Sequence, residues 1–308
     1  MVAWGSLLIA LAAVLWSTDA LFRLPLTRDL SALAIVFAEH FLALVFVLPI
    51  LWLQRSLIVR LTARQWLAVG FIGLGASALA TLAFTASFNY VSPSVSILLQ
   101  KTQPLVTFSL AWFILRERLP RNFFRWACLA LLGAYLVSFP EVIPTVSFYQ
   151  QGTVGVLLAL GAAALWGSAT VFGRYLLNDV PPPLVTALRF IVALPFLAWL
   201  LSFNHGFGSL VSISVRDFWY LVIIMLGPGF GAMYLYYRGL RVTRASVSAV
   251  LELIWPLAAV VLNWIFLGAG LSLIQIAGGI LLLSAIGKLT VWQRPQPNSQ
   301  PNISTSTA

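Results

Sequence analysis

Long apolar runs, separated by short polar segments, fill almost the whole chain. A helix that crosses a membrane needs about 20 consecutive apolar residues, and ten segments come close to that length before a polar tail begins. The pattern therefore predicts an all-α membrane protein with ten transmembrane helices, at residues 4–22, 32–53, 66–88, 93–115, 122–139, 153–173, 183–203, 217–237, 245–267 and 272–291.

The fourth and ninth of these segments resemble each other. A Ser-Val-Ser triplet followed by a proline occurs at residues 94–96 with Pro104, and again 152 residues later at residues 246–248 with Pro256. Each half of the chain holds five spans, and because five is odd, the second half would enter the membrane from the opposite side. We therefore predict two inverted five-helix repeats, at residues 1–140 and 141–294, with a substrate site near the midplane where they meet.

The composition agrees with a lipid environment, because only 8% of the residues are charged whereas a soluble domain carries about 25%. Thirteen of the 18 lysines and arginines fall in segments that lie on one side of the membrane. The exceptions are Arg23, Arg28 and Arg216 on the other side, and Lys101 and Arg189 within spans. Cytoplasmic loops are enriched in such residues, which predicts a multi-pass protein of the cytoplasmic (inner) membrane with both termini in the cytoplasm. The basic residues are interpreted as topology signals, so no nucleic-acid partner is expected.

The polar residues within the spans are the candidates for function. On a helical wheel Gln100 and Gln103 share one face of the fourth span, and Glu252, Trp255 and Asn263 occupy the matching face of the ninth. Two such faces would line a substrate path between the repeats. The alternative is hydrogen bonding between packed helices, worth about 0.6 kcal/mol each. A glutamate is costly inside a membrane, which favours the substrate path.

Lys101 and Arg189 have two interpretations each. Lys101 would be the counter-charge for a substrate carboxylate or phosphate, or it would form an ion pair with Asp19, Glu39 or Glu252. Arg189 would be an intramembrane cation, or it would extend to the cytoplasmic interface as long basic side chains do. The aromatic residues Trp16 and Trp166, with the neighbouring tyrosines Tyr234, Tyr236 and Tyr237, are further candidates for the cavity lining.

Asp19, Glu39 and His40 fall toward the outer ends of the first and second spans. A carboxylate beside a histidine could relay a proton, since burial favours the protonated form of a carboxyl. The alternative is a local hydrogen-bonded pair that orients the helices. Glu117, between arginines at the end of the fourth span, is interpreted as a solvated cytoplasmic cap, and residues 295–308 as a disordered cytoplasmic tail.

Several short motifs occur in the same order as in one known family. They include Leu15-Trp16-Ser17, Leu165-Trp166-Gly167-Ser168, Leu188-Arg189-Phe190 and Leu115-Arg116-Glu117-Arg118-Leu119, together with the two proline-containing spans. In these features the chain resembles the EamA-type ten-helix members of the drug/metabolite transporter superfamily. The resemblance covers about residues 4–291 and implies transport of a small molecule, while the substrates of such families range over amino acids, sugars, nucleotides and drugs.

Together these observations predict a secondary transporter that works by alternating access. The expected substrates are small polar metabolites, amino acids or related compounds, moved outward, with possible coupling to protons. A channel-like conduit is the alternative, and a membrane-embedded lipid-modifying enzyme is less favoured. No phosphate-binding loop is present, and two histidines and one cysteine offer no metal-ligand spacing, so neither a cofactor nor a metal is expected.

Overall fold

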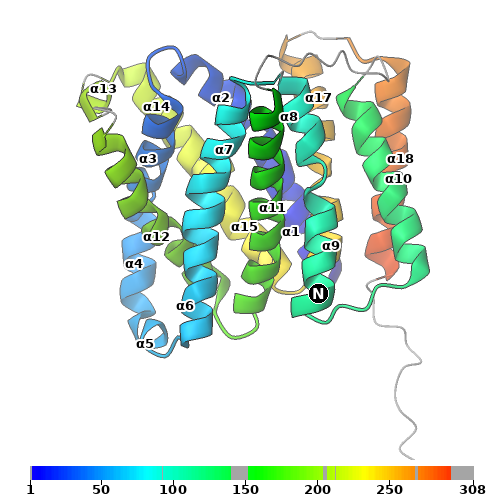
Figure 1. Ribbon diagram of the computed structural model, residues 1–308, viewed down its shortest axis with the longest axis horizontal. Coiled ribbons are helices and arrows are strands. Elements are labelled where there is room, and N and C mark those ends of the chain that lie inside the picture. The colour runs from blue at the N-terminus through cyan, green and yellow to red at the C-terminus, as the bar shows by residue number, and fades with distance from the viewer. Residues whose placement is uncertain are drawn as a thin grey trace, which may run out of the picture.

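The computed structural model describes residues 2–91, 93–139, 152–203, 207–211, 213–267 and 270–292. Within these ranges the chain is helical, with no β-strand, and the helices stand side by side in one bundle (Figure 1). The first half contains α1 (Val2–Ser17), α2 (Asp19–Leu26), α3 (Ala32–Leu42), α4 (Leu44–Leu53), α5 (Arg55–Ile58), α6 (Ala63–Gly70), the π-helix η1 (Phe71–Leu79), α7 (Ala80–Ser87), α8 (Pro93–Gln100), α9 (Gln103–Ile114) and α10 (Arg121–Ser138). The second half contains α11 (Gly152–Leu176), α12 (Pro182–Phe203), α13 (Phe207–Val211), α14 (Val215–Ile224), the π-helix η2 (Met225–Gly229), α15 (Phe230–Leu240), α16 (Ala245–Leu251), α17 (Ile254–Leu267) and α18 (Leu273–Trp292).

The prediction of an all-α membrane fold is confirmed. Seven helical segments in the described ranges are long and apolar enough to cross a membrane, and α3 with α4 makes an eighth if this pair, bent by 43°, is one span. The predicted fourth span is interrupted after Gln100, and the fifth, α10, carries Arg121 and Arg125 in its first turns. The number of ten spans stays a prediction, as does the boundary between repeats, which falls in residues outside the described ranges, like the tail from residue 295.

The fourth and ninth segments are broken helices. α8 ends at Gln100 and α9 begins at Gln103, while α16 ends at Leu251 and α17 begins at Ile254. Each break comes just before a proline, Pro104 or Pro256. Proline has no backbone N–H and its ring clashes with the carbonyl four residues earlier, so the helix cannot continue regularly through the preceding turn. The two breaks place polar side chains halfway along helices that are otherwise apolar.

α9 and α16 pack against each other in antiparallel directions. At one end the Gln103 amide donates to the Glu252 carboxylate over 2.8 Å. At the other end Glu117 accepts hydrogen bonds from the backbone N–H groups of Ala245 (2.8 Å) and Ser246 (3.2 Å). The interpretation of Glu117 as a solvated cap of its own helix is therefore wrong, because it caps the first turn of α16, whose N-cap residue Arg244 has no acceptor in its side chain.

Glycines allow two pairs of helices to approach closely. A β-carbon on Gly133 of α10 would lie 2.7 Å from the backbone nitrogen of Leu282 in α18. A β-carbon on Gly239 of α15 would lie 2.6 Å from the carbonyl oxygen of Gly5 in α1. Close approach of backbones through small residues is the usual way in which membrane helices pack. The α1–α15 contact joins the two halves at the end of the bundle where the N-terminus lies (Figure 1).

Candidate functional site

A cavity of about 440 Å³ lies between the two broken helices and the helices around them. Its wall is built from α1, α2, α3, α7, α11, α12, η2 and α15 and from the two proline-containing segments around their breaks. The predicted site residues that line it are Trp16, Asp19, Glu39, Gln100, Lys101, Gln103, Trp166, Glu252 and Trp255. The structure therefore brings together residues that are separated by more than 200 positions in the chain.

Three predicted residues remain, and for one of them only the backbone is described. The side chain of Asn263 lies outside the described part of the structure. Tyr234 stacks on Phe230, with ring centroids 6.3 Å apart, and the guanidinium of Arg238 lies 4.8 Å from the Tyr234 ring. Both contacts are with side chains of its own helix, α15, and Tyr234 is not among the residues that line the cavity, contrary to the prediction. His40 is the third, and its contacts are described below.

Glu252 is at the centre of a hydrogen-bond network that joins the two halves. Its carboxylate accepts hydrogen bonds from Tyr236 Oη at 2.6 Å, Gln103 Nε2 at 2.8 Å and Thr170 Oγ1 at 3.4 Å. Thr170 and Tyr236 also contact each other, with their oxygens 2.9 Å apart. All three donors are neutral, so the carboxylate is held in place without an ion pair. The carboxylate can still accept a hydrogen bond from a bound molecule or form an ion pair with a positively charged group on it.

Thr170 is not predicted from the sequence, and Tyr236 is not distinguished there from the tyrosines beside it. Tyr236 was one of three neighbouring tyrosines in an aromatic run, at positions 234, 236 and 237. Residues two positions apart on a helix point about 200° away from each other. Tyr234 and Tyr236 therefore cannot both face the cavity, and the sequence contains no signal that sets the rotation of α15. Thr170 carried no signal, because a lone threonine in an apolar helix usually bonds its own backbone.

Arg23 binds two carboxylates at the wall of the cavity. Its Nε and Nη2 atoms donate to Asp19 at 2.5 and 2.9 Å, and Nη2 also donates to Glu39 at 2.5 Å. Arg23 was assigned from the sequence to a loop outside the membrane, but it lies in α2, which continues the first span. The bidentate contact with Asp19 uses the planar geometry of the guanidinium.

His40 is buried and does not join these carboxylates. Its Nδ1 lies 2.8 Å from the carbonyl oxygen of Val36, and its ring centroid lies 4.7 Å from that of Phe190. Its Nε2 atom has no hydrogen-bond partner in the described residues. The structure thus places Asp19 and Glu39 together through Arg23 and places His40 elsewhere.

Lys101 lies in the break between α8 and α9. Its Nζ is 5.4 Å from the centroid of the Trp255 ring, which belongs to the other proline-containing segment. No carboxylate lies within ion-pair distance of Lys101 in the ranges that the structure describes. The alternative of a structural ion pair with Asp19, Glu39 or Glu252 is therefore wrong, and the ammonium group is held over an aromatic face instead.

Arg189 lines the cavity and does not extend to the interface. Its Nε donates to Ser77 Oγ at 2.7 Å, and its Nη1 donates to Tyr237 Oη at 3.1 Å. Ser77 belongs to η1 in the first half, and Tyr237 belongs to α15 in the second. The sequence places this arginine within a span, but it does not indicate whether the side chain points into the cavity or toward the interface.

Aromatic rings form much of the remaining wall. Trp16 packs against Tyr236 with ring centroids 5.3 Å apart, and Trp166 packs against Phe84 at 5.4 Å. The Trp166 indole N–H donates to the carbonyl oxygen of Ala76 at 3.0 Å, which fixes the orientation of this ring. A planar ring system in the cavity would find apolar faces beside charged and hydrogen-bonding groups.

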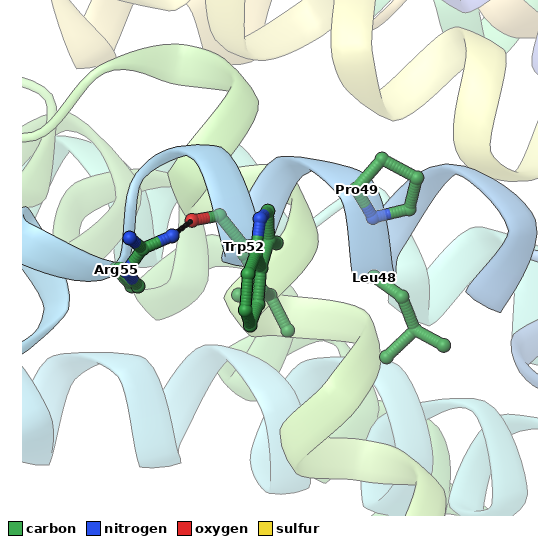
Figure 2. Close-up of a pocket in the computed structure, with 5 residues that line it drawn as sticks. Leu48, Pro49, Trp52 and Arg55 are labelled. Carbon is green, nitrogen blue, oxygen red and sulfur yellow. Dashed lines mark hydrogen bonds between the residues drawn. The ribbon is translucent and has the colours of Figure 1, made fainter.

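A second hollow lies on the surface of α4 and α5, where Leu48, Pro49, Trp52 and Arg55 line it (Figure 2). Arg55 lies over the Trp52 ring at 4.6 Å and donates to the Trp52 carbonyl at 3.3 Å. Tryptophan and arginine at a helix end are typical of the membrane interface. This hollow holds no carboxylate and faces outward, so the central cavity is the candidate site. No cluster of three or more potential metal ligands is present in the described residues.

Comparisons with known proteins agree on one family. The chain matches the EamA-like transporter family twice, over residues 3–139 and 153–290. It is 32% identical over 290 residues to the riboflavin transporter ImpX of Fusobacterium nucleatum, covering 93% of this chain and 97% of that protein. It is 27% identical over 212 residues to a probable amino-acid metabolite efflux pump of Salmonella typhimurium, covering 65% and 67%. A solved crystal structure with 19% sequence identity has the same fold, with a TM-score of 0.72 over 94% of this chain and 97% of the other.

Proposed function

Because the chain belongs to the EamA-like transporter family, we propose that it is a secondary transporter that carries a small polar metabolite by alternating access. It is a multi-pass integral membrane protein. The distribution of lysine and arginine supports the cytoplasmic membrane as its location, with both termini in the cytoplasm. The observation that carries the proposal is the central cavity, in which charged and aromatic side chains from both halves of the chain meet.

Three features support alternating access between two inverted repeats. α9 and α16 run antiparallel and are broken at corresponding positions. The residues that line the cavity come from the middle of the bundle and from α2 at one end. At the other end α1 contacts α15 through Gly5 and Gly239, and Glu117 joins the end of the fourth segment to the start of α16, so helices from both halves are in contact there. Transporters built from inverted repeats place their site at such breaks and open it to one side at a time.

Two substrate classes are supported by specific observations. Amino acids or related compounds, exported from the cell, fit a cavity in which Glu252 lies near the cations Lys101 and Arg189, and one relative is named for amino-acid metabolite efflux. Riboflavin fits the aromatic faces of Trp16 and Trp166, and a relative that is 32% identical and matched over 97% of its length is named for riboflavin. Compounds of both classes carry polar groups and are small enough for a cavity of about 440 Å³.

The test is counterflow into proteoliposomes that contain the purified protein, with labelled riboflavin in one series and labelled L-tryptophan in another. We expect saturable uptake of at least one of them when the unlabelled compound is loaded inside. Glu252→Gln should reduce that uptake at least tenfold, whereas Tyr234→Phe, outside the cavity wall, should leave it unchanged. Non-saturating flux would favour a conduit, and chemical conversion of the labelled compound would favour an enzyme.

We further propose that Asp19 and Glu39 couple transport to protons. Protonation of either carboxyl would release it from Arg23, which holds both in the structure. An imposed pH gradient should then drive accumulation, and Glu39→Gln should abolish that dependence while counterflow without a gradient persists. Equal accumulation with and without the gradient in the wild type would reject proton coupling.

A further inference from the structure

Arg189 differs from the other arginine of the cavity in its partners. Arg23 is neutralised by two carboxylates, whereas Arg189 donates to two neutral hydroxyl groups, those of Ser77 and Tyr237. No carboxylate lies within 4.0 Å of Arg189 in the part of the chain that the structure describes. Glu252 is near enough to interact with it electrostatically but does not touch it.

A charged side chain in the middle of a spanning helix is costly and is usually compensated by a partner or by the contents of a cavity. A guanidinium has five N–H donors in a planar fork. Arg189 has two hydrogen bonds to groups in the described part of the protein, so further N–H donors remain for a bound molecule. The side chain is partly exposed, and it lines the cavity.

Ser77 and Tyr237 hold this guanidinium from two different helices. Tyr237 is fully buried, and Ser77 is 7% exposed, so both hydroxyls are fixed by packing. A charge that is held in place before a ligand arrives loses little freedom on binding. A planar fork of this kind matches the geometry of carboxylate and phosphate groups.

We propose that Arg189 is the residue that binds an oxyanion of the substrate, a carboxylate or a phosphate, and that Ser77 and Tyr237 are its positioning residues. Lys101 adds a second positive charge to the same cavity. Glu252, near Arg189 without an ion pair, receives the donor or cationic end of the same molecule. This proposal rests on the proposed transport function and narrows its substrate to compounds with a negatively charged group.

The experiment measures binding of two matched pairs of probes to the full chain in lipid nanodiscs by isothermal titration calorimetry. L-tryptophan differs from tryptamine by one carboxylate, and flavin mononucleotide differs from riboflavin by one phosphate. In at least one pair the anionic member should bind at least tenfold more tightly, which corresponds to about 1.4 kcal/mol. The pair that shows the preference identifies carboxylate or phosphate as the group recognised.

Arg189→Gln should bring the two members of that pair to within about twofold of each other. Arg189→Lys should keep part of the preference, because it retains the charge and loses the fork. Ser77→Ala and Tyr237→Phe should reduce the ratio between anionic and neutral probe by severalfold, which a purely structural role would not do. The control is Arg238→Gln, since Arg238 is an exposed arginine over Tyr234, outside the cavity wall.

Equal affinity of the wild type for both members of each pair, or binding of none of the four probes, would overturn the proposal. A preference that survives Arg189→Gln would also overturn it, and thermal unfolding of each variant shows whether that variant is folded. The transport proposal fails separately. Absence of counterflow together with a preference that depends on Arg189 would reject transport and leave the oxyanion site standing.

Discussion

The hydrogen bond between Tyr236 and Glu252 can be tested by a double-mutant cycle. Tyr236→Phe removes the hydroxyl that donates to Glu252 over 2.6 Å. Glu252→Gln keeps an oxygen acceptor and the shape of the side chain but removes the charge. Tyr236 also contacts Thr170, and that contact cancels in the cycle because it is lost in both backgrounds.

The size of the coupling depends on whether Glu252 is charged. A donor-acceptor distance of 2.6 Å lies in the range of O–H···O⁻ hydrogen bonds, which is 2.5–2.7 Å. Hydrogen bonds to charged groups contribute about 1.5–3 kcal/mol, whereas neutral bonds between membrane helices average about 0.6 kcal/mol. The difference predicts a coupling of about 1–2 kcal/mol between the two substitutions.

The assay is reversible unfolding in mixed detergent micelles, which yields the free energy of unfolding for the wild type, both single variants and the double variant. Tyr234→Phe with Glu252→Gln is the control cycle and should show no coupling, because Tyr234 packs on Phe230. At a pH low enough to protonate Glu252, the coupling of Tyr236 should fall toward zero, since both backgrounds then hold a neutral acceptor. A coupling below about 0.6 kcal/mol at neutral pH would refute the inference that Glu252 is charged and accepts a strong hydrogen bond from Tyr236.

Three further predictions concern the packing of glycines, the cap on α16 and the ion pairs of Arg23 with Asp19 and Glu39. Gly133→Ala should destabilise the protein by about 1–3 kcal/mol, because its β-carbon would meet the α18 backbone at 2.7 Å. Gly161→Ala, whose β-carbon would meet nothing within 4 Å, should be neutral or should stabilise the protein by up to about 1 kcal/mol. If Gly133→Ala and Gly161→Ala changed the thermal unfolding temperature equally, the close packing of α10 on α18 would be contradicted. Glu117→Ala should cost about 1 kcal/mol through loss of the cap on α16, and Glu117→Gln, which keeps an acceptor, less than half of that; the two unfolding free energies should differ. Arg23→Met should lower the free energy of unfolding by about 2 kcal/mol. Breaking a fully buried ion pair costs about 3–5 kcal/mol, and the cost here is smaller because the Arg23 side chain is 28% exposed. Adding Glu39→Gln to that variant should restore part of the stability, and a double variant no more stable than the single one would show that the carboxylates do not depend on Arg23.

The class of the protein could be predicted from the amino-acid sequence, and so could nine of the residues that line its cavity. Runs of about 20 apolar residues have the length needed to cross a lipid bilayer as helices. The family match agrees with the inference that this is a membrane protein. A polar side chain in such a run is tolerated where it faces the protein interior. For this reason Gln103 and Glu252 could be assigned to a shared cavity, and the structure joins them by a hydrogen bond of 2.8 Å. The breaks before Pro104 and Pro256 were not predicted, because each of these spans was expected to be one continuous helix. The missing N–H of proline is nevertheless a local signal for them.

The directions of individual side chains, and the groups that they contact, follow from the packing of the whole bundle. Tyr236 lines the cavity and Tyr234 does not, because the rotation of α15 is set by its packing against α1 and α12. Arg189 faces the cavity because Ser77 and Tyr237, distant in sequence, hold its guanidinium. Glu117 caps a helix that begins 128 residues later. Apolar periodicity shows that a helix is buried on one side, but the partner on that side follows from contacts between distant segments, and these depend on how all the helices pack together.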